Sequence, residues 1–237
     1  MAVFFKVFSL SNLNFMLQGV GMLLAVASVS IVLSLLLGTL LGTVKAYGPN
    51  VPRAAVSVYI EVFRTTPNLL WILIIYFLVP FGSGLSPMQK DFSAGVLAFT
   101  LFTSAVVAEI VRGGLNSIPT GQFEGAQSQG FTLVQTLRYI VLPQALRVSV
   151  PALLSQVITV VKDTSLLAAV NIAELTVNGR IVIGQFSGDG AALLLVYGFM
   201  ALVYFSICFS LSIVVRRMQK RRPSGRPGKW EKEPQAA

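Results

Sequence analysis

The sequence predicts an all-α membrane protein with five transmembrane helices. Of its 237 residues, 54% are hydrophobic and only 11% are charged, and the mean hydropathy is +0.76. A soluble domain carries about a quarter charged residues, so this composition indicates a membrane protein. Five windows reach the length of about 20 mostly apolar residues that a spanning helix needs. The windows lie at about 17–44, 54–80, 92–111, 148–170 and 191–215.

The first and last windows contain no charged residue. Window 17–44 is longer than a span requires, which predicts a tilted helix. Its small residues Gly38 and Gly42 suit close packing against another helix. Window 191–215 continues without a charge until Arg216. Both windows therefore read as ordinary spans with no sign of a site inside them.

Ionisable residues interrupt or end the other three windows. The second contains Glu61, Arg64 and Pro67, the third ends near Glu109 and Arg112, and the fourth contains Lys162 and Asp163. An ionisable group within a bilayer is costly and usually faces protein or a water-filled path. These positions are therefore the candidates for function within the membrane.

The distribution of basic residues predicts the orientation of the chain. Five spans place the two termini on opposite sides, and a cytoplasmic C-terminus puts thirteen Lys and Arg residues inside against three outside. The inner ones are Lys45, Arg53, Arg112, Arg138, Arg147 and the eight that follow residue 215, and the outer ones are Lys6, Lys90 and Arg180. Because cytoplasmic segments carry the excess of basic residues, we expect the N-terminus outside and the polar segment 113–147 in the cytoplasm. The outer segment 171–190 is expected to form a short re-entrant or interfacial helix, and the sequence leaves both alternatives open.

Several classes of function are disfavoured by what the sequence contains. There is no His, the one Cys (Cys208) lies in an apolar run, and no HExxH or Gly-x-Ser-x-Gly motif occurs. We therefore expect neither catalysis nor a metal site. The net charge of +9 is concentrated at the C-terminus, where eight of the 18 Lys and Arg residues lie in the last 22. A basic run after an apolar helix fits anionic lipid rather than nucleic acid, and we expect the tail 218–237 to be disordered.

The polar segment 113–147 has its own pattern. Small polar residues run from Pro119 to Gln129, and Gly130 permits a positive φ or a close backbone approach. An apolar stripe at near-helical spacing follows, made of Phe131, Leu133, Leu137, Ile140 and Val141. Pro143 cannot continue a regular helix without a kink. We predict two short helices meeting at Gly130, with the acidic Glu124 near one end. On periodicity alone, a loop that merely packs on its own bundle is an equal alternative.

Fixed spacings in this segment carry a family resemblance. The pattern is Glu-Gly-Ala, three residues, Gly, nine residues, and Ile-x-Leu-Pro, formed by Glu124, Gly125, Ala126, Gly130, Ile140, Leu142 and Pro143. It resembles the EAA loop of ABC importer permeases, and the one departure is Gly125, where the family usually has Ala. The stretches FRTTP (63–67), AEIVRGGLNSIPTGQFE (108–124) and LPQALR followed by VPALLSQVITVVKDTSL (142–166) resemble the polar amino acid branch. That branch includes the histidine, glutamine, glutamate and arginine permeases. Within it, the stretches SQGF and LRYIVLPQALR most resemble the glutamine and glutamate permeases.

The resemblance covers residues 15–217 and implies a type I ABC importer permease fold over about residues 1–217. In such importers the EAA loop is a coupling helix seated in a groove of a cytoplasmic ATPase. The family further implies a second permease subunit, an extracytoplasmic amino acid-binding protein and a location in the bacterial inner membrane. This chain has no GxxxxGK[ST] phosphate loop, so ATP and Mg²⁺ are expected on the partner ATPase and no cofactor on this chain.

The ionisable residues within the second and fourth windows predict a path for substrate. Arg64 lies about ten residues into its window, roughly 15 Å deep, and Asp163 about fifteen residues into its own, roughly 22 Å deep, at ~1.5 Å per residue. Transporter sites usually lie near the midplane. Arg64 suits a carboxylate and Asp163 an ammonium group. The predicted path residues are Glu61, Arg64, Thr65, Thr66, Lys162, Asp163, Thr164 and Ser165.

Two structural alternatives remain open for these residues. Glu61–Arg64 and Lys162–Asp163 are each close enough in sequence to form an ion pair that only fixes helix packing. Glu109 and Arg112 are also three apart, and an interfacial pair that anchors the polar loop is the preferred interpretation. A self-contained secondary transporter or channel is the alternative for the whole chain, although five spans without an internal repeat argue against it.

Overall fold

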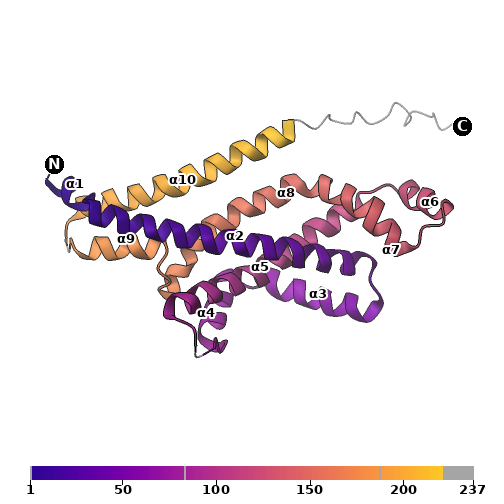
Figure 1. Cartoon of the computed structure of the whole chain (residues 1–237), viewed down its shortest axis with the longest axis horizontal. Coiled ribbons are helices and arrows are strands. Elements are labelled where there is room, and N and C mark those ends of the chain that lie inside the picture. Colours follow the sequence, from indigo (N-terminus) through magenta and orange to yellow (C-terminus); the bar gives the residue numbers. More distant parts are fainter. Residues whose placement is uncertain (1, 83, 187, 221–237) are drawn as a thin grey trace, which may run out of the picture.

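The computed structural model describes residues 2–82, 84–186 and 188–220, and the regular structure within these residues is entirely helical (Figure 1). The helices are α1 (Ala2–Val7), α2 (Leu10–Tyr47), α3 (Asn50–Thr65), α4 (Asn68–Leu78), α5 (Pro87–Asn116), α6 (Thr120–Ser128), α7 (Leu133–Thr136), the π-helical η1 (Leu137–Val141), α8 (Leu142–Asp163), the 3-10 helix η2 (Thr164–Val170), α9 (Leu175–Gly184) and α10 (Gly190–Lys220). Most of the predicted tail, residues 221–237, lies outside the described residues. The all-α prediction is confirmed over the part of the chain that the structure describes.

Four helical stretches of the described chain are long and apolar enough to cross a membrane. They are Leu10–Tyr47, Pro87–Asn116, Leu133–Val170 and Gly190–Met218. Each contains one of the predicted windows, and each extends beyond it. The first begins at Leu10 because the side chain of Ser9 accepts a hydrogen bond from the Asn12 N–H and caps the helix there.

The second predicted window is not a single straight span. It forms α3 and α4, which together pass the same test of length and polarity but are bent by 106°. Pro67 causes the break, because proline lacks an N–H and disfavours helical backbone in the residue before it. Thr66 accordingly has extended backbone angles (φ −104°, ψ 148°). The prediction of one helix over 54–80 is therefore wrong, although Arg64 itself lies before the break, within α3.

The helices α2 and α5 form the closest contact between long helices, and they run parallel. Ser30 and Ser34 of α2 donate hydrogen bonds to the carbonyls of Val96 and Thr100, each 66 residues further along the chain. The same offset of 66 residues relates Gly38 to Ser104 and Gly42 to Ala108. A Cβ on Gly38 would lie 2.8 Å from the Ser104 carbonyl, and one on Gly42 would lie 2.5 Å from the Ala108 carbonyl. We call this contact the α2–α5 seam. The prediction that Gly38 and Gly42 serve close packing is confirmed.

The segment 171–190 contains α9, a helix packed inside the chain. Glu174 is fully buried and caps α9, since its carboxylate accepts hydrogen bonds from the Val177 N–H at 3.0 Å and the Tyr204 hydroxyl at 2.9 Å. Burial raises the pKa of the Glu174 carboxyl. Gly19 of α2 lies against this cap, where an added Cβ would come within 2.7 Å of the backbone of Glu174 and Leu175. α9 is thus held by α2 and α10.

The molecule has two distinct ends along its long axis. Figure 1 shows α6 and α7 at one end and α1 and α9 at the other. We call the first the loop end and the second the far end. α2, α5 and α10 run from the far end towards the loop end, while α3 and α8 run back (Figure 1). The alternating directions of the long helices therefore place the predicted EAA motif, which begins in α6, at one end of the bundle.

Candidate functional site

The loop end consists of two short helical pieces joined at a glycine. α6 starts after Pro119 and gives way to Gln129 and Gly130, whose φ is +80°. Thr132 and Gln135 then form a capping box that starts α7. A non-glycine residue is strained at a φ of +80°, so Gly130 is required for the sharp turn. The expected meeting of two helices at Gly130 is present, but only α6 is short, because α7 continues through η1 and α8 as one helical stretch from Leu133 to Val170.

The loop is anchored to the ends of the spanning helices. Ala126 is 3% exposed, and its carbonyl accepts a hydrogen bond from the Phe131 N–H at 3.1 Å, which closes the turn. Phe123 packs on Tyr47 at the end of α2, with their ring centroids 5.6 Å apart. Gln144 of α8 donates to the Gln122 side chain at 2.9 Å. Displacement of the loop therefore acts on α2 and α8 directly.

The outer surface of the loop carries both apolar and polar groups. Val134 is 72% exposed, and Phe131, Leu133 and Tyr139 are also exposed. Glu124, Gly125 and Gly130 are also exposed. We call this exposed surface of α6, η1 and α7 the loop surface. Of the remaining motif residues, Ile140 and Leu142 are half-buried and Pro143 is exposed. The predicted apolar stripe is therefore divided, because Val141 is fully buried in the bundle and Leu133 is not.

Pro143 does not end the helix at this point. The chain widens into the π-helical turn η1, in which the Leu142 N–H donates to the carbonyl of Leu137, five residues back. Pro143, which has no N–H, then takes a position in the first turn of α8, where it is tolerated. The result is a helical stretch from Leu133 to Val170 that carries the loop end deep into the bundle.

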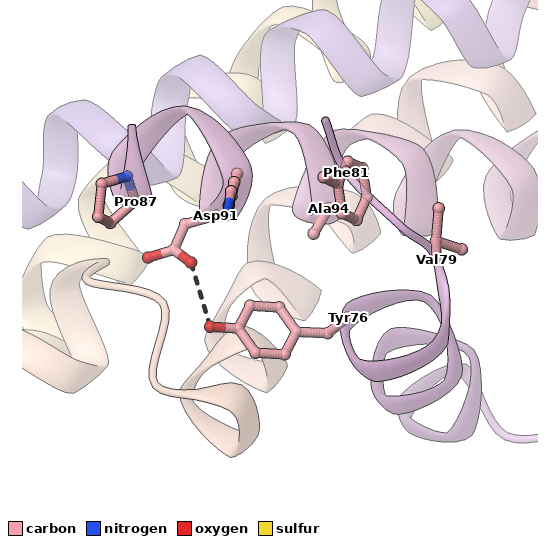
Figure 2. A pocket seen from close by; sticks show the side chains of 7 residues that line it. Tyr76, Val79, Phe81, Pro87, Asp91 and Ala94 are labelled. Carbon is pink, nitrogen blue, oxygen red and sulfur yellow. Dashed lines mark hydrogen bonds between the residues drawn. The ribbon is translucent and has the colours of Figure 1, made fainter. Parts of the chain in front are cut away.

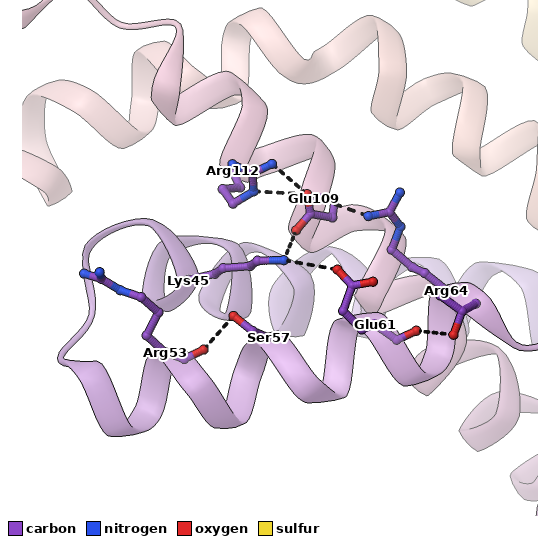
Figure 3. A network of polar contacts seen from close by, with 8 residues as sticks. Lys45, Arg53, Ser57, Glu61, Arg64, Glu109 and Arg112 are labelled. Atoms are coloured by element: carbon purple, nitrogen blue, oxygen red, sulfur yellow. Dashed lines mark hydrogen bonds and ion pairs between the residues drawn. The ribbon is translucent and has the colours of Figure 1, made fainter.

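A second polar site lies where α2, α3 and α5 meet, and it is organised by Glu109 (Figure 3). The Lys45 ammonium lies 2.6 Å from one carboxylate oxygen of Glu109. The other oxygen accepts from the Arg112 guanidinium at 2.9 and 3.0 Å and lies 3.7 Å from Arg64. The side chain of Glu109 is 15% exposed. One carboxylate thus meets three cations, which we call the Glu109 cluster.

The Glu109 cluster changes the expected pairing. The predicted pair Glu109–Arg112 is confirmed. Glu61 and Arg64 do not pair with each other: Glu61 lies 4.0 Å from Lys45, and Arg64 turns to Glu109. Sequence reasoning had given Lys45 no role, because its partners are 16 and 64 residues away. Its position three residues after Gly42, in the helix with the small residues, is the one available signal.

The predicted residues at the end of α8 have different surroundings. The carboxylate of Asp163 accepts a hydrogen bond from the Asn68 side chain at 3.3 Å. Lys162 is exposed and forms no ion pair within 4.0 Å in the described chain. Thr164 is buried and donates to the Val161 carbonyl, while Ser165 donates to that of Lys162. A Lys162–Asp163 ion pair is therefore not formed.

The break between α3 and α4 joins the two groups of predicted residues. Arg64 precedes the break and reaches the Glu109 cluster, whereas Asn68 follows it and reaches Asp163. Thr65 and Thr66 lie at the break, and their hydroxyls donate to the carbonyls of Glu61 and Val62. Asn68 is the fourth residue after Arg64, which is at most about 14 Å of extended chain. Sequence reasoning had not singled out Asn68, although its position directly after Pro67 marks the start of the new helix.

Comparisons with known proteins identify the family of this chain. The family "Binding-protein-dependent transport system inner membrane component" matches residues 34–223. The probable glutamine ABC transporter permease protein GlnP of Bacillus subtilis is 38% identical over 92% of this chain and 99% of its own length. The glutamine transport system permease protein GlnP of Escherichia coli K12 is 33% identical over 87% of this chain and 92% of its own.

A solved structure supports the same assignment. A crystal structure of an amino acid ABC transporter with histidines superposes with a TM-score of 0.75 at 28% identity, covering 90% of this chain and 96% of that one. The family match covers the loop end, the Glu109 cluster and the end of α8. The chain therefore belongs to the binding-protein-dependent transport system inner membrane components, and it is a permease subunit of an ABC transporter rather than an enzyme.

Proposed function

We propose that this chain conducts a polar amino acid, glutamine or glutamate, across the bacterial inner membrane and that its loop end docks on the ATPase that drives transport. The observation that carries the proposal is the loop surface, which is exposed outward while its inner face is anchored to α2 and α8. Its relatives in Bacillus subtilis and Escherichia coli are named as glutamine permeases, which supports the choice of substrate.

The orientation that this function needs follows from the basic residues. Towards the loop end the described chain carries Lys45, Arg53, Arg112, Arg138 and Arg147, and α10, which runs in that direction, contains Arg216 and Arg217 in its last turns (Figure 1). Lys6, Lys90 and Arg180 belong to the far end. The excess of positive charge supports a cytoplasmic loop end and an N-terminus on the outside. The bent pair α3–α4 then serves as the fifth crossing.

The loop surface has the composition of a docking site for another protein. Exposed apolar side chains beside an acidic residue favour a partner with an apolar groove and a basic rim. The anchoring contacts at Ala126, Phe123 and Gln144 transmit a pull on this surface to the bundle. ATP and Mg²⁺ bind to the partner ATPase in this scheme. The seven EAA-motif residues thus form a mechanical joint.

Substrate crosses along the polar side chains of the spanning segments. Ser155, Thr159 and Lys162 follow one face of α8, with spacings of four and three, and none of them is buried. The Ser155 and Thr159 hydroxyls donate to carbonyls of their own helix, whereas the charged Lys162 needs protein or water beside it rather than lipid. A second permease subunit opposite this face completes a hydrated path, and Asp163 with Lys162 offers a charge to each end of a zwitterion. An extracytoplasmic binding protein delivers the amino acid at the far end.

A pair of glycine variants tests the docking role. Gly130→Ala places a Cβ at a φ of +80°, which costs about 1–2 kcal/mol and displaces the turn. We expect ATP-driven glutamine uptake by the reconstituted complex to fall several-fold, while the amount of permease in the membrane is unchanged. Gly125→Ala is the matched control, since a Cβ there meets nothing within 4 Å and the family usually has Ala. Equal uptake by both variants would remove the loop from the coupling mechanism.

Co-purification separates this function from that of a self-contained carrier. The tagged chain should bring an ABC ATPase with it from the membrane, and uptake should stop when ATP is absent. A Glu124→Lys variant reverses the charge of the loop surface, and we expect it to lose the ATPase. Uptake by the chain alone in proteoliposomes, without ATP, would instead establish a secondary transporter.

A further inference from the structure

A polar pocket opens between the end of α4 and the start of α5, in the half of the molecule away from the loop end (Figures 1 and 2). Its volume is about 410 Å³, within the range of small-molecule sites. Tyr76, Val79 and Phe81 line it from one side, and Lys90 and Asp91 from the other. The predicted substrate path does not include these residues, so their chemistry is unassigned.

Two opposite charges in this pocket lack charged partners. One carboxylate oxygen of Asp91 accepts a hydrogen bond from the Tyr76 hydroxyl at 3.2 Å, and Figure 2 shows the other directed away from Tyr76. In the described part of the chain Lys90 forms no side-chain hydrogen bond or ion pair, and Asp91 forms no ion pair. Neighbouring residues of a helix do not face each other, which explains why Lys90 and Asp91 do not pair. A ligand that bears both charges can satisfy both groups.

We propose that this pocket binds the backbone of a free α-amino acid, with the ammonium on Asp91 and the carboxylate on Lys90. One acidic and one basic side chain give the pocket no net charge, which favours a zwitterion over a metal cation or an anion. The described residues also hold no cluster of three His, Cys, Asp or Glu side chains that suits a metal ion. Tyr76 and Phe81 provide an apolar wall for the amino acid side chain.

The position of the pocket gives it a role in delivery. It rests on the proposed function, under which the far end faces the outside and receives an amino acid from a binding protein. α4 carries Asn68 at its start, in contact with Asp163, and Tyr76 eight residues later, in contact with Asp91. The two contacts are therefore about 12 Å apart along α4 at ~1.5 Å per residue. The pocket is the first binding site that the amino acid meets on the outer side, next to the substrate path at Asp163.

Protection of an introduced cysteine tests the site directly. Val79→Cys in a Cys208→Ser background places a thiol on the pocket wall of the complete complex, held in nanodiscs. We expect saturating L-glutamine to slow its reaction with a small maleimide at least threefold. Glutaramic acid, which is glutamine without its α-amino group, should give no protection. Leu85→Cys lies on the same connection between α4 and α5 but outside this pocket, and its rate should not change.

The charge is tested in the same background. Asp91→Asn should abolish the protection by L-glutamine, while Tyr76→Phe, which keeps the carboxylate, should retain most of it. If Val79→Cys fails to assemble, Ala94→Cys on the other wall replaces it. Unchanged labelling with L-glutamine, or protection that persists in Asp91→Asn, overturns the proposal. ATP-driven L-glutamine uptake by the unmodified complex is measured in parallel. Uptake without protection refutes only the pocket, and absence of uptake refutes the proposed function itself.

Discussion

Glu109 and Asp163 are both carboxylates within long, mostly apolar helices, yet they are partnered in opposite ways. Glu109 is approached by Lys45, Arg64 and Arg112 and is mostly buried among them (Figure 3). Asp163 accepts one amide hydrogen bond from Asn68, and its neighbour Lys162 forms no ion pair in the described chain. A carboxylate with its full set of partners has nothing left to offer a ligand. An under-partnered one can bind a charged substrate at little cost.

This difference bears on alternatives that the sequence left open. It preferred an interfacial ion pair for Glu109 and Arg112, and it allowed Glu61–Arg64 and Lys162–Asp163 to be either structural ion pairs or parts of a path. The geometry supports a structural role for the Glu109 cluster and keeps Asp163 and Lys162 as candidates for substrate contact. Arg64 belongs to the structural Glu109 cluster because it lies close to the Glu109 carboxylate. It is also a candidate for substrate contact because it lies at the break between α3 and α4. The following variants test this division.

The largest effect is expected for Glu109→Gln. Neutralising this carboxylate removes the anion that Arg64 and Arg112 contact and leaves Lys45 with only Glu61 at 4.0 Å. Breaking a buried pair costs about 3 kcal/mol at the low end of its range, which suits cations that are partly exposed. We expect little assembled complex to be recovered from the membrane, measured by quantitative purification and by the melting midpoint of what remains. Near-normal yield together with altered substrate preference would show that the cluster belongs to the path and would break the comparison.

Gly42→Ala tests the helix contact that brings Lys45 to Glu109. The added Cβ would lie 2.5 Å from the Ala108 carbonyl, which belongs to the backbone and cannot move aside alone. Overpacking of this kind costs about 1–3 kcal/mol, so we expect a lower melting midpoint. Gly21→Ala on the same helix is the control, because a Cβ there meets nothing within 4 Å. A control that melts as low as Gly42→Ala would refute the explanation by close packing.

Asp163→Asn should act on transport rather than on assembly. The asparagine side chain keeps an oxygen that can accept from Asn68 but loses the charge for an ammonium group. We expect the apparent KM of ATP-driven glutamine uptake to rise about tenfold, which is ~1.4 kcal/mol, with the melting midpoint unchanged. The reverse pattern, a low midpoint with a normal KM, would assign Asp163 the same structural role as Glu109.

The smallest effect is expected for Glu61→Gln. The side chain of Glu61 is 63% exposed, and its oxygen lies 4.0 Å from Lys45, which Glu109 holds much more closely. Exposed pairs of this kind contribute about 0–1 kcal/mol, so the yield and melting midpoint should stay near those of the parent chain. A marked loss of stability would mean that Glu61 is a full member of the Glu109 cluster.

The sequence was informative where local rules determine the structure. Gly130 was expected at a turn because of its conformational freedom, and its φ is +80°. Runs of apolar residues marked the four long helices, since burial in lipid depends on composition alone. The family spacing from Glu124 to Pro143 indicated the loop. Each of these features is contained in a short stretch of chain.

The sequence was less informative where contacts between distant segments decide the outcome. Pro67 was recognised as a helix breaker, but the size of the bend depends on how α4 packs against α5 and η2, which no local rule contains. Arg64 had an acidic residue three positions earlier, and it instead pairs with one 45 positions later. Pro143 was expected to kink the helix, but the helix continues through it because the π-helical turn η1 precedes it. Asn68, Lys45 and the pocket at Asp91 all depend on such tertiary contacts.

The constant step along the α2–α5 seam has a mechanical consequence. Val96, Thr100, Ser104 and Ala108 present their carbonyls to one face of α2 at every turn. Sliding α2 along α5 by a fraction of a turn would break both serine hydrogen bonds. It would also bring side chains of α2 against the α5 backbone where Gly38 and Gly42 now lie. The pair therefore resists shear and behaves as a single beam, about 45 Å long over the 30 residues of α5 at ~1.5 Å each. A displacement of this helix pair at the loop end is therefore transmitted to its other end without sliding between α2 and α5.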